Sequence, residues 1–405
     1  MQALLSHQQA KIDKFRQLCV GADFGEPGTG KTRSTIELVN ATEATICVYI
    51  APFRAINPPD GMPGIKDEIA KWGGFKMETV YIAPETIASS DRQYLQLYKK
   101  IAAAWCTAIV LDESSKIKNR EAKRTARITE LGKMARYKYI LNGTPIARCL
   151  QDIKPQMDFL SPLILNMSDA EYKNTYCEHI TIKKRFGTRW YQKNFVTKYH
   201  NIDHLYSIIE PYVFDCKLNI GIDRQYITLP YTVGEAEKKE YYRLKAKYLD
   251  DETLQWKNNN IFLELTQKMQ HGYCVTEDKF EVLNEFLKTC DRKKVLLYRK
   301  FIESETELKK RYPDIPVLSI QSDSQSLNLQ AYDTIVKWDH TWDYLLIDQL
   351  FPRVVRTGQT SAVCRMVSMT GDVNLEGLME QNNERKGGML KYFKQKGYRE
   401  TIQLL

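Results

Sequence analysis

The chain has 405 residues, of which 43% are hydrophobic and 27% are charged, and its formal net charge is +9. These values exclude collagen-like and low-complexity proteins, argue against a mostly disordered chain, and predict two to three domains of about 150 residues each. The basic excess fits a polyanionic partner without proving one, because many soluble proteins are equally basic.

No apolar run approaches the ~18 residues that a membrane span needs, and residues 1–8 lack the basic and apolar regions of a signal peptide. The nine cysteines include no Cys-x-x-Cys pair, which argues against a disulfide framework and against a zinc ribbon. We therefore expect a cytoplasmic protein with reduced thiols. Its short length without accessory domains favours a bacterial or phage origin.

Short apolar runs alternate with helical patterns along the first 165 residues. Such runs are typical of buried parallel strands, and the alternation predicts a doubly wound α/β sheet. The expected strands are residues 46–51, 79–83, 108–111 and 137–141.

The segment Gly25–Thr32 reads Gly-Glu-Pro-Gly-Thr-Gly-Lys-Thr and fits the P-loop, or Walker A, pattern G-x-x-x-x-G-K-[ST]. It follows a short strand pattern at 20–24 and precedes a helical pattern at 34–40. Glycines let backbone N–H groups wrap a phosphate, Lys31 would reach the β- and γ-phosphates, and the Thr32 hydroxyl would coordinate Mg²⁺. The expected nucleotide-binding residues of this loop are Gly25, Gly28, Thr29, Gly30, Lys31 and Thr32.

An acidic pair, Asp112 and Glu113, directly follows the apolar run 108–111. A P-loop needs such a partner at the end of another strand. Asp112 would hold Mg²⁺ together with Thr32, and Glu113 would polarise the attacking water.

The region 166–280 is richer in Tyr, Lys and Asn and is expected to be irregular and mostly helical, with helices near 236–249 and 261–270. Within it, residues 181–195 interleave basic and aromatic side chains and predict a β-hairpin with its turn near Gly187. Its cations would neutralise phosphates and Trp190 would stack on a base. The alternative is a solvated hairpin packed on the first lobe by its aromatics. The predicted DNA contacts of the hairpin are Lys183, Lys184, Arg185, Arg189 and Trp190.

Histidines and cysteines near this hairpin are weak zinc candidates, because they include no paired cysteines. We expect them to be ordinary surface or core residues. They are Cys177, His179, His200 and His204.

The strand–helix pattern resumes near residue 281. The expected strands are 294–298, 317–321, 334–338 and 362–368, and a closing helix is expected at 375–393. The chain is therefore expected to divide into a first ATP-binding lobe (1–165), an insertion with the hairpin and linking helices (166–280), a second lobe (281–379) and a C-terminal helical tail (380–405).

The segment Asp112–Asn119, Asp-Glu-Ser-Ser-Lys-Ile-Lys-Asn, resembles motif II of the SNF2-like group of superfamily 2 helicases. Other segments resemble further motifs of that group in the expected order. They are Leu4–Gln8 (adenine-reading segment), Ala51–Arg54 with Lys71–Trp72 (motif Ia), Tyr81–Ile87 (Ib), Leu141–Ile146 (III), Val295–Tyr298 (IV), Ser326–Gln330 (V) and Gln349–Gln359 (VI).

This resemblance implies an α/β fold of two RecA-like lobes, parallel sheets flanked by helices, with an irregular helical and hairpin insertion between them. It implies a DNA-dependent ATPase, a helicase or translocase that uses ATP and Mg²⁺, acts on duplex, single-stranded or branched DNA, and works as a monomer. By the same resemblance Gln8 reads adenine, Arg356 is the arginine finger and Arg353 is an accessory contact.

The resemblance also assigns DNA contacts and coupling residues. The DNA contacts are Pro52, Phe53, Arg54, Asn328 and Gln330. The residues that would couple ATP to DNA are Gly143, Thr144, Pro145 and Gln349.

Two features depart from the family pattern. Residues 302–316 leave room for about one helix between motifs IV and V, so the second lobe is expected to lack a strand–helix unit. Ser322–Ser326 replaces the usual Gly-Gly-x-Gly, which puts the coupling between DNA and ATP in doubt but not nucleotide binding.

The sequence is compatible with three classes of function to different degrees. The leading interpretation is an ATP-driven motor on DNA, and the sequence leaves open whether it separates strands or only moves along them. The second is a nucleic-acid-binding protein with a degenerate, weakly active motor. The third, an unrelated P-loop enzyme such as a nucleotide kinase, does not explain motifs III, V and VI.

Overall fold

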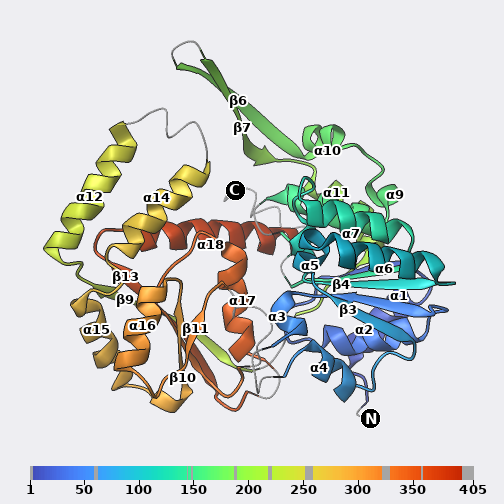
Figure 1. The fold of residues 1–405 in the computed structure, drawn as a ribbon, viewed down its shortest axis with the longest axis horizontal. Helices are drawn as coiled ribbons and strands as arrows, with labels where there is room; N and C mark the ends of the chain where they lie inside the picture. Colours follow the sequence, from blue (N-terminus) through green and yellow to red (C-terminus); the bar gives the residue numbers. More distant parts are fainter. Residues whose placement is uncertain are drawn as a thin grey trace.

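Two parallel β-sheets, each flanked by helices, form two lobes, and a long hairpin projects from the first of them (Figure 1). This confirms the predicted α/β fold class. The computed structural model describes residues 3–58, 63–143, 145–146, 149–186, 189–217, 221–250, 259–321, 329–356 and 359–394.

The first sheet has six strands in the order β3-β2-β4-β5-β1-β8, all parallel. The four strands predicted from apolar runs are present to within one residue. Because all strands run the same way, their carboxyl ends meet at one edge, where α/β proteins bind ligands. The strands are β1 (Val20–Asp23), β2 (Ile46–Ile50), β3 (Glu78–Ile82), β4 (Thr107–Asp112), β5 (Tyr137–Leu141) and β8 (Val213–Phe214).

Both faces of this sheet are covered, which explains why its central strands read as continuous apolar runs. In β2, Val48 and Ile50 pack into the core on one face, while Cys47 and Tyr49 pack into the core on the other. Full burial of an aliphatic side chain of this size contributes about 1.5–3 kcal/mol. The helices of this lobe are α1 (Ser6–Phe15), α2 (Lys31–Asn40), α3 (Phe53–Ile56), α4 (Ile65–Lys71), α5 (Pro84–Ser89), α6 (Asp91–Ala103), α7 (Lys123–Lys133), α8 (Ile153–Leu160) and α9 (Pro162–Leu165).

The predicted hairpin is an antiparallel pair, β6 (Cys177–Phe186) and β7 (Arg189–Tyr199), preceded by α10 (Asp169–Tyr176) and followed by α11 (Ile202–Ile209). Only its base packs on the first lobe, and the rest projects away from both sheets (Figure 1). The predicted turn near Gly187 lies outside the described residues.

The second sheet has five parallel strands in the order β11-β10-β12-β13-β9. Four were predicted to within three residues. The fifth, β9 (Asp223–Tyr231), falls in the region expected to be irregular and mostly helical, yet it pairs along its whole length with β13. The others are β10 (Val295–Arg299), β11 (Val317–Ser319), β12 (Thr334–Lys337) and β13 (Val363–Gly371).

The helices of the second lobe agree with the expected pattern, and α16 alone connects β10 to β11. The single helix expected within residues 302–316 is therefore present, and the lack of a strand–helix unit relative to the family stays a prediction. The helices are α12 (Glu235–Asp250), α14 (Asn259–His271), α15 (Glu277–Leu287), α16 (Ile302–Arg311), α17 (Tyr344–Val354) and α18 (Leu375–Lys394).

Within the described residues, none of the helices combines the length and the apolar character that crossing a bilayer would require.

Candidate functional site

The loop Gly25–Thr32 connects the end of β1 to the start of α2 at the carboxyl edge of the first sheet. Gly30 is the N-cap of α2 with φ 75°, and Gly28 has φ 89°. A Cβ at Gly30 would meet only the flexible end of the Gln8 side chain, so it is the left-handed backbone conformation that requires glycine. The loop therefore presents the N-terminus of α2 to the edge of the sheet, an arrangement that attracts anions.

The side chain of Lys31 lies across its own loop. Its Nζ donates to the carbonyl oxygens of Gly25 at 2.8 Å and Glu26 at 3.1 Å. Thr32 follows it in the first turn of α2, and both line a pocket with Asp112 and Glu113. The structure thus brings the predicted loop and the predicted acidic pair together.

A buried lysine that was not predicted contacts residues at both ends of this loop. Lys11 Nζ lies 2.7 Å from Asp23 Oδ2, and it also donates to the carbonyl of Lys31 and to Thr35 Oγ1. Asp23 in turn accepts from the backbone N–H of Gly25 at 3.0 Å. This ion pair connects α1 to both ends of the loop, and no spacing rule in the sequence could have revealed it.

Gln8 of α1 also lies beside the glycine loop. Its Oε1 accepts from the N–H of Leu5 at 3.0 Å, and its Nε2 lies 3.4 Å from the carbonyls of Thr29 and Gly30. The structure therefore places Gln8 against the loop. Its reading of adenine stays a prediction.

Asp112 ends β4, and a second unpredicted residue, Tyr49 of β2, lies beside it. The Tyr49 hydroxyl is 3.4 Å from Asp112 Oδ2 and also interacts with Thr32. Burial raises the pKa of Asp112 to about 6, with a contribution from the Glu113 carboxylate, while Lys31 and Arg353 oppose the shift. Hydroxyl and carboxylate oxygens are hard ligands, so Thr32 and Asp112 suit Mg²⁺.

The raised pKa of Asp112 predicts how the stability of the protein depends on pH. An aspartate titrates near 3.9 in an unfolded chain, so the ionised form destabilises the folded protein, and this penalty grows between about pH 4 and pH 6. In buffer free of metal and nucleotide, Asp112→Asn is expected to raise the free energy of unfolding by about 1–3 kcal/mol at pH 8 and by less at pH 4.5. Chemical denaturation at both pH values measures this. Asp13→Asn, on the exposed face of α1, is the control, and an equal effect of Asp112→Asn at both pH values would contradict the prediction.

Glu113 is where the two lobes meet. Gln349 Nε2 of α17 donates to Glu113 Oε2 at 2.9 Å, and Arg353 Nη2 lies 3.6 Å from Glu113 Oε1. Glu113 itself has φ 53°, a left-handed conformation that is costly for a non-glycine residue and is found often at functional sites. Residues predicted separately from the two halves of the chain thus contact one carboxylate.

The spacing of three residues between Arg353 and Arg356 predicts that they share a helical face, and this is wrong for Arg356. Helix α17 ends at Val354, and the N–H of Arg356 donates to the carbonyl of Val354, two residues back, instead of continuing the helical pattern. Both arginines nevertheless line the same pocket as Lys31. Burial and the charge of Arg353 lower the pKa of Arg356, while Glu68 of α4 raises it.

The segment after β5 packs against the loop. A Cβ at Gly143 would lie 2.8 Å from Pro27 Cδ, so this glycine permits the close approach. Buried Gln156 of α8 accepts from Ser114 Oγ at 2.6 Å and donates to the carbonyl of Pro145 at 2.8 Å. Gln156 therefore links the acidic segment to the Gly143–Pro145 segment, and sequence reasoning missed it. Thr144 lies outside the described residues.

The predicted DNA contacts differ in exposure. Pro52 is buried and lines the pocket, whereas Phe53 is 50% exposed and Arg54 is exposed. Gln330 is half-buried, and Asn328 lies outside the described residues.

In the hairpin, Trp190 is 67% exposed, and Lys183 and Arg185 are exposed. Lys184 and Arg189 lie in β6 and β7. Trp190 itself does not pack on the first lobe, whereas Tyr199 at the base of the hairpin does, so the DNA contact of the hairpin stays a prediction. Within the described residues, the zinc candidates near the hairpin do not gather into a group of three, and His204 instead contacts the Tyr176 hydroxyl.

Residues 76–311, more than half of the chain, match the family model of the SNF2-related domain. A search of curated proteins gave no match. Among solved structures, the Sulfolobus solfataricus SWI2/SNF2 ATPase core in complex with dsDNA is similar at 16% sequence identity and a TM-score of 0.41, over 94% of this chain and 90% of that chain.

Proposed function

Because this chain belongs to the SNF2-related family, we propose that it is an ATP-driven motor that moves on or remodels DNA. ATP would bind between the lobes and bring them together, and its hydrolysis would let them separate. The observation that carries this proposal is the contact of Gln349 and Arg353 from the second lobe with Glu113 of the first. Glu113, which would position the attacking water, therefore lies in the first lobe and is held by residues of the second.

Each residue of the pocket would have its own role in phosphoryl transfer. The loop N–H groups and Lys31 would hold the β- and γ-phosphates, and Glu113 would orient the attacking water. Arg356 would approach the γ-phosphate and stabilise the charge that develops there. Since Lys31 and Arg356 lie on different lobes, hydrolysis would require the lobes to close.

The chain also offers a place for Mg²⁺. The Thr32 hydroxyl and the Asp112 carboxylate would hold it, and Tyr49 would fix the Asp112 oxygen. A bound Mg²⁺ would neutralise charge on the β- and γ-phosphates. The raised pKa of Asp112 fits this role, because a cation would favour the ionised carboxylate.

The test is ATP hydrolysis measured without DNA and with duplex, single-stranded and forked DNA. Stimulation by one of these supports the motor, and strand displacement on the fork would add unwinding to movement. DNA binding without hydrolysis would favour the alternative, a nucleic-acid-binding protein with a degenerate motor. Phosphoryl transfer to a small acceptor without DNA would contradict both.

The hairpin is the second part of the proposal. Replacing Lys183, Lys184, Arg185 and Arg189 with alanine is expected to weaken DNA binding and to reduce the slope of log affinity against log salt by up to about 3–4 units. Each phosphate contact contributes about 0.9 to that slope. Fluorescence anisotropy with labelled forked DNA across a salt series measures both quantities.

A charge-matched variant controls for the loss of four positive charges. It carries alanine at four exposed lysines away from the hairpin, namely Lys99, Lys133, Lys288 and Lys293. ATPase activity without DNA should survive in both variants, because none of the eight residues lines the nucleotide pocket. If the slope of log affinity against log salt is the same for the hairpin variant and the wild type, the hairpin does not contact DNA.

A further inference from the structure

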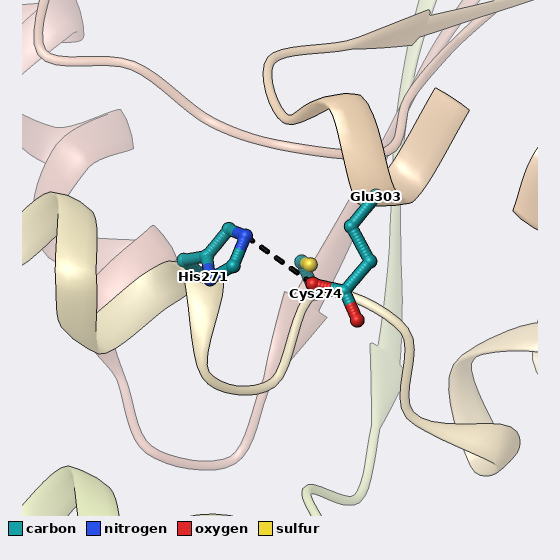
Figure 2. A group of neighbouring side chains, drawn as sticks. All are labelled: His271, Cys274 and Glu303. Carbon is teal, nitrogen blue, oxygen red and sulfur yellow. Dashed lines mark ion pairs between the residues drawn. The ribbon is translucent and has the colours of Figure 1, made fainter. Parts of the chain in front are cut away.

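A histidine, a cysteine and a glutamate meet on the second lobe (Figure 2). His271 ends α14, Cys274 lies in the turn that follows, and Glu303 lies in the first turn of α16. Their ligand atoms are all within 4.8 Å of one another, and no other group of three such side chains gathers this closely within the described residues. None of the three lines the nucleotide pocket.

We propose that His271, Cys274 and Glu303 bind one Zn²⁺ ion. Imidazole nitrogen, thiolate sulfur and carboxylate oxygen are the three donor types that zinc uses in proteins. A thiolate and a carboxylate together carry two negative charges, which balance the charge of the ion. Three protein ligands leave the fourth tetrahedral position for water.

The distance between the nitrogen and oxygen donors fits a tetrahedral ion. Zinc lies about 2.0–2.2 Å from N or O and about 2.3 Å from S, which places neighbouring ligand atoms about 3.3–3.8 Å apart. His271 Nε2 and Glu303 Oε2 are 3.2 Å apart. The sulfur lies within 4.8 Å of both, so small side-chain rotations would complete the geometry.

The backbones that carry these ligands are fixed by two residues that directly follow β12. Trp338 Nε1 donates to the carbonyl of Cys274 at 2.8 Å. Asp339 accepts from the N–H groups of Lys300 at 2.8 Å and Phe301 at 3.1 Å, and from Ser304 Oγ at 3.2 Å. One strand end therefore holds the backbone of both the Cys274 turn and the start of α16.

The orientation of the imidazole is also fixed by a neighbouring ring. The rings of His271 and Phe301 meet edge to face, with centroids 5.0 Å apart.

Cys274 is buried, while the side chains of His271 and Glu303 are each 51% exposed, so an ion could enter from solvent and reach the sulfur between them. Burial raises the pKa of the Cys274 thiol to about 11, and coordination would displace that proton.

The bound ion would tie the end of α14 to the start of α16. Without it, these helices share the ion pair of His271 with Glu303, and exposed pairs of this kind contribute only about 0–1 kcal/mol. Zinc would thus fix the helical layer of α12 and α14 on the second sheet. This role does not depend on ATP hydrolysis.

The test uses the full chain, stripped with a chelator and titrated with Co²⁺ as a spectroscopic substitute for Zn²⁺. We expect one equivalent to bind with a sulfur-to-cobalt charge-transfer band, and Zn²⁺ to displace it and raise the melting temperature. Cys274→Ser should lose the band. His271→Ala and Glu303→Gln should weaken binding by at least about 100-fold, since loss of outer-shell partners alone costs 10–100-fold.

Matched controls lie elsewhere in the chain. Cys290→Ser removes a half-buried thiol of the same lobe, and His200→Ala removes the histidine of another His–Glu pair, 3.8 Å from Glu178. Both should bind Co²⁺ like the wild type. Absence of the band in the wild-type protein, or its survival in a folded Cys274→Ser variant, would overturn the proposal and leave an ordinary ion pair.

Discussion

Replacing Lys31 with alanine is expected to lower ATP hydrolysis by at least about 10²–10³-fold, the usual cost of removing one preorganised donor from a charge-stabilising site. Lys31 is the cation that directly follows the glycine loop, and it lies within reach of Gly25 and Glu26. DNA binding should remain close to wild type, because the exposed hairpin is separate from the pocket. Phosphate release and DNA anisotropy, measured on the same preparation, give the two quantities.

Two variants sharpen this prediction. Lys31→Arg keeps the charge but not the compact ammonium, and it should also fail to hydrolyse ATP at the wild-type rate. Lys100→Ala, in a surface pair with Glu78, should behave like the wild type. Wild-type turnover in a folded Lys31→Ala protein would remove the phosphate-binding assignment of the loop.

Replacing Arg356 with alanine is expected to lower the turnover number by about 10³–10⁵-fold, with much less effect on the KM for ATP. The reason is that an arginine finger stabilises the transition state more than the bound substrate. Arg356 follows α17 on the second lobe and lines the pocket of the first. Steady-state kinetics at saturating DNA separate the two parameters.

Arg385→Ala, on the exposed part of α18, is the matched control for loss of an arginine. Arg353→Ala should show an intermediate loss, because Arg353 contacts Glu113 and would act through it. A large rise in KM with unchanged turnover in Arg356→Ala would contradict the role and indicate a ground-state contact.

The sequence predicts the strands of the first lobe well for a physical reason. Strands buried on both faces, such as β2 and β4, must be continuously apolar, and this pattern needs no knowledge of their neighbours. Strand β9 is different. It begins with Asp223-Arg224-Gln225, lies at the edge of the second sheet and is largely exposed, so its sequence carries no such pattern.

Within the site, too, some residues were predictable from the sequence and others were not. The glycine loop and the acidic pair follow local spacing rules, and the structure brings them together with both arginines. Lys11, Tyr49 and Gln156 support them through contacts between distant segments, and such contacts leave no periodic trace. The helical face predicted for Arg353 and Arg356 failed because α17 ends two residues before Arg356.

The pairing of β9 with β13 has a consequence for how the chain folds during synthesis. Asp223 pairs with Val363, which is made 140 residues later. At 5–20 residues per second, β9 waits roughly 7–28 s for its partner after leaving the ribosome. The first sheet needs nothing beyond Phe214, so it can be complete while the second still lacks an edge. The nascent chain therefore passes through a state with one folded lobe and an unpaired strand, the kind of edge that recruits chaperones or other chains.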